Sequence, residues 1–168
     1  MQPALVYVYF VSDVATLDDS EGGADNTSAF LWEGNPTDQL EVMLIPQQGD
    51  PIRWRRWGVT RADVEAVSKS LRYEATSQFS RPQSYLPPAQ QLYRWIMQPM
   101  EDELAASHID NLAFIMDDGL RTIPLAMLHD GESFLVEQYS LGLMPTFSLT
   151  ELETASVAHS QREESRVL

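Results

Sequence analysis

The sequence predicts an α/β fold, and three observations lead to that prediction. Leu112 to Met116 is an unbroken apolar run, as in a strand that is buried on both faces of a sheet. Several short strand-like segments lie in the N-terminal third of the chain. Two stretches with helical periodicity separate those segments from the apolar run. We therefore expect a mixed sheet flanked by helices, in which Leu112 to Met116 is an inner, parallel strand.

The first 58 residues are predicted to form an antiparallel meander. Its expected strands are rich in β-branched, aromatic and aliphatic residues: Ala4 to Val11, Ser28 to Trp32, Leu40 to Pro46 and Ile52 to Trp57. The last of these strands is expected to end at Gly58. Asp13 to Thr27 is acidic and has little to bury, so it is predicted to be an exposed loop. Gln47 to Pro51 contains Gly-Asp-Pro, which favours a hairpin turn.

Two amphipathic helices are predicted next, in the part of the chain between residues 59 and 110. The first begins at Thr60, where Asp63 follows at the spacing of a helix cap. Its apolar stripe is Val64, Val67, Leu71 and Ala75. The second opens at Pro87-Pro88, and its stripe is Leu92, Ile96, Met100 and Leu104. Pro99 lies inside that stripe and is expected to kink the helix or to split it.

The C-terminal part begins with turns that follow the apolar run. Asp117-Asp118-Gly119 and His129-Asp130-Gly131 suit tight turns, and Leu125 to Leu128 suits one helical turn between them. Two short strands are then expected, Phe134 to Glu137 and Tyr139 to Leu143. Residues 1–147 are assigned to one unit, divided into antiparallel strands (1–58) and helices with the central strand (59–147). Residues 148–168 are assigned to a C-terminal helix over Glu151 to Ala158, capped by Ser148 or Thr150, and a polar tail.

Composition excludes several classes of function. The chain has 168 residues and no cysteine, so disulfides, thiolate metal sites and cysteine nucleophiles are excluded within it. Its formal net charge is -14, which makes nucleic acid or an anionic membrane a poor default partner. No apolar run approaches the roughly 20 residues of a membrane helix, and Leu5 to Val11 lacks the basic leader of a signal peptide. A soluble, cytoplasmic protein is expected.

One group of residues has the composition of a carboxylate–histidine site. Asp117, Asp118, His129 and Asp130 follow predicted strand and helix ends, where α/β folds often place ligands. However, Asp118-Gly119 and Asp130-Gly131 are ordinary turn formers, and turn residues are much commoner than metal clusters. The turn interpretation is favoured, and no catalytic, cofactor-binding or metal-binding residue is predicted.

A basic band lies within this acidic chain. Residues 1–52 contain nine acids and no base, whereas residues 53–72 contain six bases, namely Arg53, Arg55, Arg56, Arg61, Lys69 and Arg72. Arg53-Trp54-Arg55-Arg56-Trp57 mixes basic and aromatic residues as single-stranded nucleic-acid binders do. An edge strand half buried by tryptophan explains the same residues, with Arg53, Arg55 and Trp57 on one face and Ile52, Trp54 and Arg56 on the other. Four methionines are interpreted as core filling: Met97, Met100, Met116 and Met127.

Three segments resemble the front part of a CHAT domain, the caspase-like domain often found behind tetratricopeptide repeats. They are Tyr85 to Tyr93 (YLPPAQQLY), Asn111 to Leu128, and Asp130-Gly131 followed by Phe134 to Tyr139 (FLVEQY). The most specific part runs from Asp118 to Gly131 and on into FLVEQY. The resemblance covers roughly residues 60–150.

The resemblance implies a caspase-like, three-layer α/β fold and the chemistry of a cysteine peptidase, a hydrolase of the caspase and separase type. In that family a cysteine thiolate attacks a peptide carbonyl and a histidine handles the protons. Both residues lie on loops that follow later parallel strands, downstream of the stretch matched here. The three histidines, His108, His129 and His159, do not occupy the family's histidine motif. The resemblance therefore transfers no catalytic residue to this chain.

Two hypotheses about function follow. The chain is a non-catalytic N-terminal portion of a CHAT-type peptidase that supports the missing catalytic half, or it is a stand-alone pseudo-enzyme or protein-interaction module. Alone, it is expected to cleave no peptide. The expected partners are proteins: its own downstream catalytic region and a second copy, bound through a bare sheet edge, apolar surface, or arginines that face Asp18, Asp19 and Glu21 of that copy. The alternative to a dimer is that the segment from Thr150 covers the edge in cis.

Overall fold

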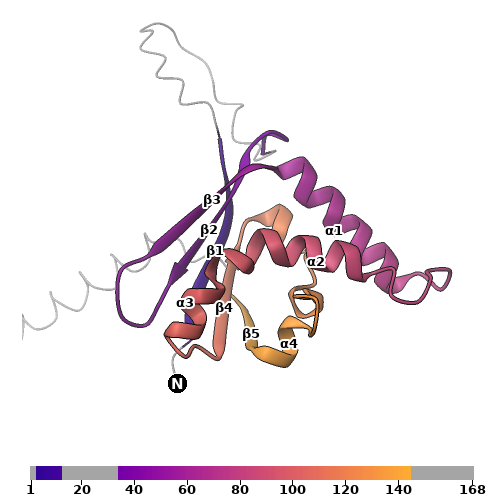
Figure 1. Ribbon diagram of the computed structural model, residues 1–168. Coiled ribbons are helices and arrows are strands. Elements are labelled where there is room, and N and C mark those ends of the chain that lie inside the picture. Colours follow the sequence, from indigo (N-terminus) through magenta and orange to yellow (C-terminus); the bar gives the residue numbers. More distant parts are fainter. Residues whose placement is uncertain (1–2, 13–33, 145–168) are drawn as a thin grey trace, which may run out of the picture.

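A five-stranded mixed sheet forms the centre of the molecule, in a computed structural model that describes residues 3–12 and 34–144 (Figure 1). The strands are β1 (Ala4–Val11), β2 (Gln39–Ile45), β3 (Ile52–Thr60), β4 (Asn111–Met116) and β5 (Ser140–Met144). Their order is β3-β2-β1-β4-β5. Neighbours among β1, β2 and β3 are antiparallel, whereas β4 is parallel to both β1 and β5. The α/β class, the N-terminal meander and the inner, parallel strand at Leu112 to Met116 are therefore confirmed.

The described helices all pack on the same face of the sheet (Figure 1). They are α1 (Arg61–Thr76), α2 (Leu86–Ile96), α3 (Glu101–Ala106) and α4 (Leu135–Gln138). Alternate strand residues such as Val6, Val42 and Phe114 are fully buried beneath them, as a sheet with a period of two requires. We call this the helix face. The opposite side, which carries Leu5 and Tyr7, is called the open face because no described helix packs on it.

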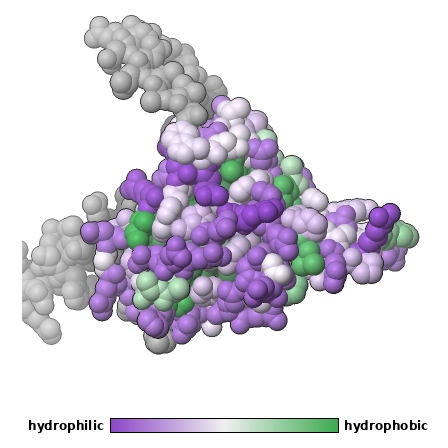
Figure 2. Space-filling model, viewed as in Figure 1, coloured by the Kyte–Doolittle hydropathy of each residue, from purple (hydrophilic) through white to green (hydrophobic). Residues whose placement is uncertain are grey.

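Methionines fill part of the core on the helix face. Met97, Met100 and Met116 are buried, and Met127 is partly buried against the same cluster. Their interpretation as core filling is confirmed. The side of the molecule seen in Figure 2 is mainly hydrophilic, and hydrophobic residues are scattered singly over it. That side offers no broad apolar patch for a partner.

Helix ends follow local signals in the sequence. Thr60 caps α1, and Asp63 completes the reciprocal capping arrangement. Val64 and Leu71 are buried in α1, but Ala75 is exposed, so the apolar stripe ends a turn earlier than predicted. Pro99 lies in a 3₁₀ turn, Gln98–Met100, that divides the second predicted helix into α2 and α3. The predicted stripe over α2 and α3 is buried as expected.

Strand β3 is longer than predicted. It was expected to end at Gly58, but it continues to Thr60. The pairing with β2 shifts between Gln39 and Leu40, and Gly58 adopts a φ of 76° at this irregularity. The Gly58 N–H donates to Oε1 of Gln39 at 2.9 Å. Glycine therefore accommodates a β-bulge here and does not end the strand.

The strand predicted at Phe134 to Glu137 is wrong. This segment forms the short helix α4, in which the Tyr139 N–H donates to the carbonyl of Leu135 at 3.0 Å. Oε2 of Glu137 accepts from the Phe134 N–H at 2.7 Å, and Leu135 is fully buried. A short apolar run can form either a helix or a strand. Here the helix places Leu135 in the core. The next predicted strand, Tyr139 to Leu143, corresponds to β5.

Some predictions concern residues outside the described ranges. They are the acidic loop Asp13 to Thr27, the strand Ser28 to Trp32, and the C-terminal helix and tail of residues 148–168. Within residues 3–12 and 34–144, no helix combines the length and the apolar character needed to cross a membrane.

Candidate functional site

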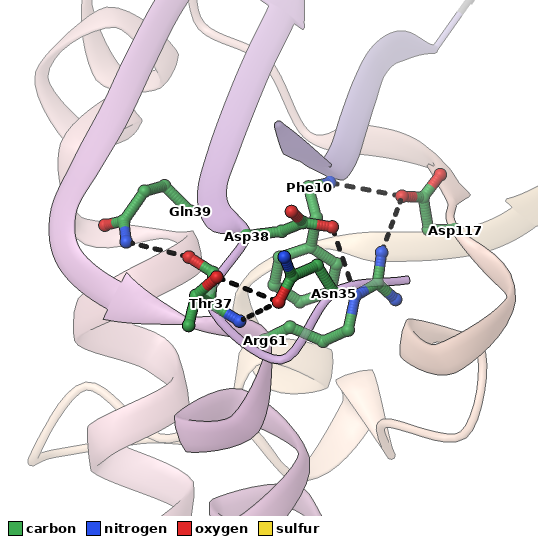
Figure 3. Close-up of polar contacts among 7 residues, drawn as sticks. All are labelled: Phe10, Asn35, Thr37, Asp38, Gln39, Arg61 and Asp117. Atoms are coloured by element: carbon green, nitrogen blue, oxygen red, sulfur yellow. Dashed lines mark hydrogen bonds and ion pairs between the residues drawn. The ribbon is translucent and has the colours of Figure 1, made fainter. Parts of the chain in front are cut away.

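The carboxyl ends of β1 and β4 meet at one edge of the sheet, the position where many α/β folds bind ligands. Asp117 directly follows β4, and its side chain turns towards β1 (Figure 3). Oδ2 of Asp117 accepts a hydrogen bond from the Phe10 N–H at 3.1 Å. The Asp117 N–H donates to the carbonyl of Val8 at 3.2 Å. Asp117 therefore links the ends of β1 and β4 through two hydrogen bonds.

Arg61, the first residue of α1, places its guanidinium group beside Asp117 (Figure 3). Its Cζ atom lies 4.2 Å from the centroid of the Phe10 ring, within the range of a cation–π contact. Its Nη2 lies 4.0 Å from Oδ2 of Asp117, and its Nε lies 3.9 Å from Oδ2 of Asp38. The Arg61 side chain is only 15% exposed. Two carboxylates thus lie beside a largely buried cation, whose Nε atom has no hydrogen-bond partner among the described residues.

The segment before β2 is shaped to cover Arg61. Oδ1 of Asn35 accepts from the Thr37 N–H at 3.1 Å and from the Thr37 hydroxyl at 2.9 Å, in an Asx-type turn. The Gln39 amide then donates to the carbonyl of Thr37 at 3.1 Å (Figure 3). At Gly34 a Cβ atom would lie 2.2 Å from Cζ of Arg61, so a larger residue would require the guanidinium group to move.

We call Phe10, Asp38, Arg61 and Asp117 the Arg61 cluster. It ties together β1, the segment before β2, the start of α1 and the end of β4. Beside it lies a shallow hollow of about 380 Å³, to which Gly34 and Arg61 contribute. Because Asp38 and Asp117 already lie beside the Arg61 guanidinium group, the cluster is better suited to fixing the loops at this edge than to binding an anion. In the sequence, Asp117 is recognisable as a residue at a strand end and Arg61 only as part of the basic band, because the four residues of the cluster are far apart in the chain.

The second Asp-Gly pair forms a turn. The Asp130 carboxylate accepts from the backbone N–H groups of Glu132 at 2.6 Å and Ser133 at 2.8 Å, and from the Gln138 amide at 2.6 Å. Burial raises the pKa of Asp130, but the hydrogen bonds from Ser133, Glu132 and Gln138 outweigh it and lower that pKa overall. This carboxylate has its hydrogen-bonding capacity occupied by the turn itself.

His129 also belongs to this turn. Its Nδ1 accepts from the Gly131 N–H at 2.9 Å, and its ring meets the ring of Phe134 edge-on, with centroids 4.9 Å apart. Asp118 begins a separate 3₁₀ turn, Asp118–Leu120. Among the residues that the structure describes, no group of three or more acidic or histidine side chains could hold a metal ion. His108 is exposed, and His159 lies outside the described residues.

The basic and aromatic residues of β3 alternate between the two faces as predicted. Trp54 pairs with Val42 and packs against the core, whereas Arg55 pairs with Glu41 on the open face. Nε of Arg55 lies 3.4 Å from Oε2 of Glu41, and its Cζ lies 5.1 Å from the Trp57 ring centroid. Trp57 is 72% exposed. The interpretation as an edge strand half buried by Trp54 is thus confirmed.

A polar row crosses the open face from β1 to β3. The hydroxyl of Tyr9 donates to Oε1 of Glu41, which also faces Arg55. Burial, followed by the hydrogen bond and the charge of Glu41, raises the pKa of Tyr9 to about 12. Tyr9 is therefore a neutral hydrogen-bond donor near neutral pH and not a candidate base.

Comparison with known proteins adds one match. The model of the CHAT domain family matches residues 86–167, from the start of α2 through β5 and beyond. A search of curated proteins and a search of solved structures each give no match.

Proposed function

Because residues 86–167 place this chain in the CHAT domain family, a family of caspase-like character, we propose that it is the non-catalytic N-terminal portion of a CHAT-type cysteine peptidase. In this proposal the chain supports the half of the domain that carries the nucleophile. The observation that carries the proposal is the open face, which has the composition of an interface.

Two rows of apolar side chains cross the open face. One row joins Ile45, Leu5 and Ala113 through the strand register, and the next joins Met43, Tyr7 and Ile115. Ala113 and Ile115 are only 4% and 7% exposed, and the others are half-buried. Sheets with parallel strands are normally covered on both faces, so these rows suit a second layer of helices. The downstream catalytic half would supply that layer.

The chemistry of the family also needs a residue from elsewhere. A cysteine peptidase attacks the peptide carbonyl with a thiolate, and this chain contains no cysteine. The Arg61 cluster would then fix the geometry of loops at the carboxyl edge of β1 and β4, next to which a nucleophile on a later parallel strand would stand. Under this proposal, this chain gives structural support, and the downstream catalytic half carries out the covalent step.

The test begins with the gene beyond the codon of Leu168. We expect that region to encode a histidine and a later cysteine, each following a strand, and to encode a polypeptide that binds this chain. The chain alone should cleave no peptide and should be indifferent to thiol-directed inhibitors, whereas the mixture should cleave peptides and be inhibited. A stop codon at that position, or peptide cleavage by the purified chain alone, contradicts the proposal.

A pair of variants tests the open face itself. Ile45→Lys puts a charge at the half-buried border of the apolar rows and should weaken binding of the downstream polypeptide. Phe79→Lys, at a side chain that is 83% exposed and lies between α1 and α2, should leave binding unchanged. Circular dichroism establishes that both variants are folded. Equal binding by both variants would place the contact elsewhere.

A second candidate function is a stand-alone protein-interaction module. The exposed side chains of Trp57 and Arg53 lie on the open face of β3, a combination that suits an acidic peptide with an apolar residue. This candidate predicts binding that weakens with added salt, and it does not require a downstream coding region.

A further inference from the structure

The two edges of the sheet differ in chemistry. The β3 edge carries Arg53, Arg55 and Arg56 and a bulge at Gly58, which are devices that discourage another strand from pairing. The β5 edge reads Ser-Leu-Gly-Leu-Met, with no charge and no proline. Its pairing with β4 is regular over all five residues, and no described strand pairs with its other side. Of the two edges, β5 is therefore the one that can accept a strand.

We propose that β5 pairs with β5 of a second copy, antiparallel and around a two-fold axis through Gly142. This register places Leu141 of each copy opposite Leu143 of the other. Both leucines lie on the helix face, because Leu141 pairs with Leu112 and Leu143 pairs with Phe114. A two-fold axis perpendicular to the sheet keeps the helix faces of the two copies on the same side, so the two sheets become one.

The surface next to β5 supplies a shape that fits this pairing. Two aliphatic side chains beside this edge face solvent, since Leu143 is 53% exposed and Val136 of α4 is 55% exposed. Val136 and Leu141 contribute to the apolar part of a hollow of about 540 Å³ between α4 and β5, which polar residues such as Asp110 and Gln138 also line. Since Leu143 of the second copy lies opposite Leu141, it can enter this hollow. Each copy offers both the projecting leucine and the hollow, as an isologous interface requires.

The response to salt distinguishes strand pairing from the arginine contacts considered from the sequence. The paired edge is neutral, so the net charge of -14 on each copy acts only at longer range and is screened by salt. Added salt should therefore leave the dimer unchanged or strengthen it. Added salt would instead weaken a dimer held by contacts between the basic band and acidic residues of a second copy. The inference does not rest on the proposed peptidase role, although a downstream strand would compete for the same edge.

The absence of native cysteine makes a direct test possible. Gly142→Cys should form an intermolecular disulfide under mild oxidation, because residues opposite each other in antiparallel strands have Cα atoms about 4.5–5.5 Å apart. A Cβ atom at Gly142 has 3.8 Å to its nearest neighbour, the Leu112 carbonyl oxygen, so the substitution fits. Trp57→Cys, at the more exposed position on the β3 edge, is the matched control and should remain uncrosslinked.

Sedimentation equilibrium gives an independent measurement. Leu143→Lys should raise the dimer dissociation constant about tenfold or more, because it puts a charge on the paired edge, and Trp57→Lys should not change it. A monomer at every concentration would overturn the inference and favour coverage of the edge in cis. Efficient crosslinking through residue 57, or a dimer that is insensitive to Leu143→Lys, would also overturn it.

Discussion

At the scale of single residues, the buried carboxylate of Glu41 is stabilised by specific partners. Glu41 is only 8% exposed, yet it lies on the face without described helices. Its two carboxylate oxygens face the Tyr9 hydroxyl and the Arg55 guanidinium group. A charge removed from water without such partners would cost several kcal/mol, so the row from β1 to β3 depends on all three side chains.

The titration of Tyr9 tests this arrangement. Its pKa of about 12 lies above the value of about 10 for an unfolded chain, so the neutral phenol is favoured by folding. The stability that it contributes is fully present below about pH 10 and is lost as the pH rises through about 12. We expect Glu41→Gln to lower the pKa of Tyr9, though not to the unfolded value, because burial remains.

Ultraviolet absorbance of tyrosinate measures this titration, and Tyr9→Phe identifies the signal by its loss. If Glu41→Gln left the Tyr9 titration unchanged, Glu41 would not be one of the causes of its raised pKa.

At the scale of elements, local caps decide where α1 begins. Oγ1 of Thr60 accepts from the Asp63 N–H at 3.2 Å, and Oδ2 of Asp63 accepts from the Thr60 N–H at 3.0 Å. Two otherwise unpaired donors of the first turn are thereby satisfied. The same boundary places Arg61 at the first helical position, from which it reaches the carboxyl edge of the sheet. The cap therefore also positions the Arg61 cluster.

Thr60→Ala should lower the free energy of unfolding by about 1 kcal/mol, the usual cost of losing a capping side chain. Hydrogen bonds from Thr60 hold the pKa of Asp63 below its ordinary value. This carboxylate therefore stabilises the fold above its unfolded pKa, and the effect is lost as the pH falls through the folded pKa. The difference between the variant and the native chain should shrink in acid.

Denaturant unfolding at neutral and acid pH measures the effect of the cap. Thr76→Ala, at the exposed C-terminal end of the same helix, is the matched control and should change the free energy of unfolding by less than about 0.5 kcal/mol. Equal losses in the two variants would mean that the cap contributes nothing specific.

At the scale of the whole molecule, one core joins the helices to one face of the sheet. Phe114 lies on the inner strand β4, is fully buried and pairs with Val6 of β1 and Leu143 of β5. Helices α1 and α2 contribute Leu71 and Leu92 to the same cluster. The stability of the described fold therefore depends on this layer.

Phe114→Ala should cost on the order of 3–5 kcal/mol, because it removes buried apolar surface and leaves a cavity. Phe79→Ala, at a side chain that is 83% exposed, should change stability by less than about 0.5 kcal/mol. Chemical denaturation with a single transition measures both. A loss below about 1 kcal/mol for Phe114→Ala would contradict its central position.

The sequence by itself determined the elements whose signals are local. Both ends of β1, the inner strand at Leu112 to Met116, the Thr60 cap and the division of the helix at Pro99 were predicted correctly. The reason is that capping hydrogen bonds, the fixed φ of proline and the period of apolar residues involve neighbours in the chain. Asp117 was also recognised as a residue at a strand end.

Only the tertiary structure decided which residues meet. The Arg61 cluster joins Phe10, Asp38 and Asp117 to Arg61, and no local pattern connects these positions. Residues 135–138 became a helix because Leu135 enters the core, and β3 passed Gly58 because its partner β2 shifts in register there. The packing of every described helix on one face of the sheet likewise depends on contacts between distant residues, and a local pattern does not contain the energies of those contacts.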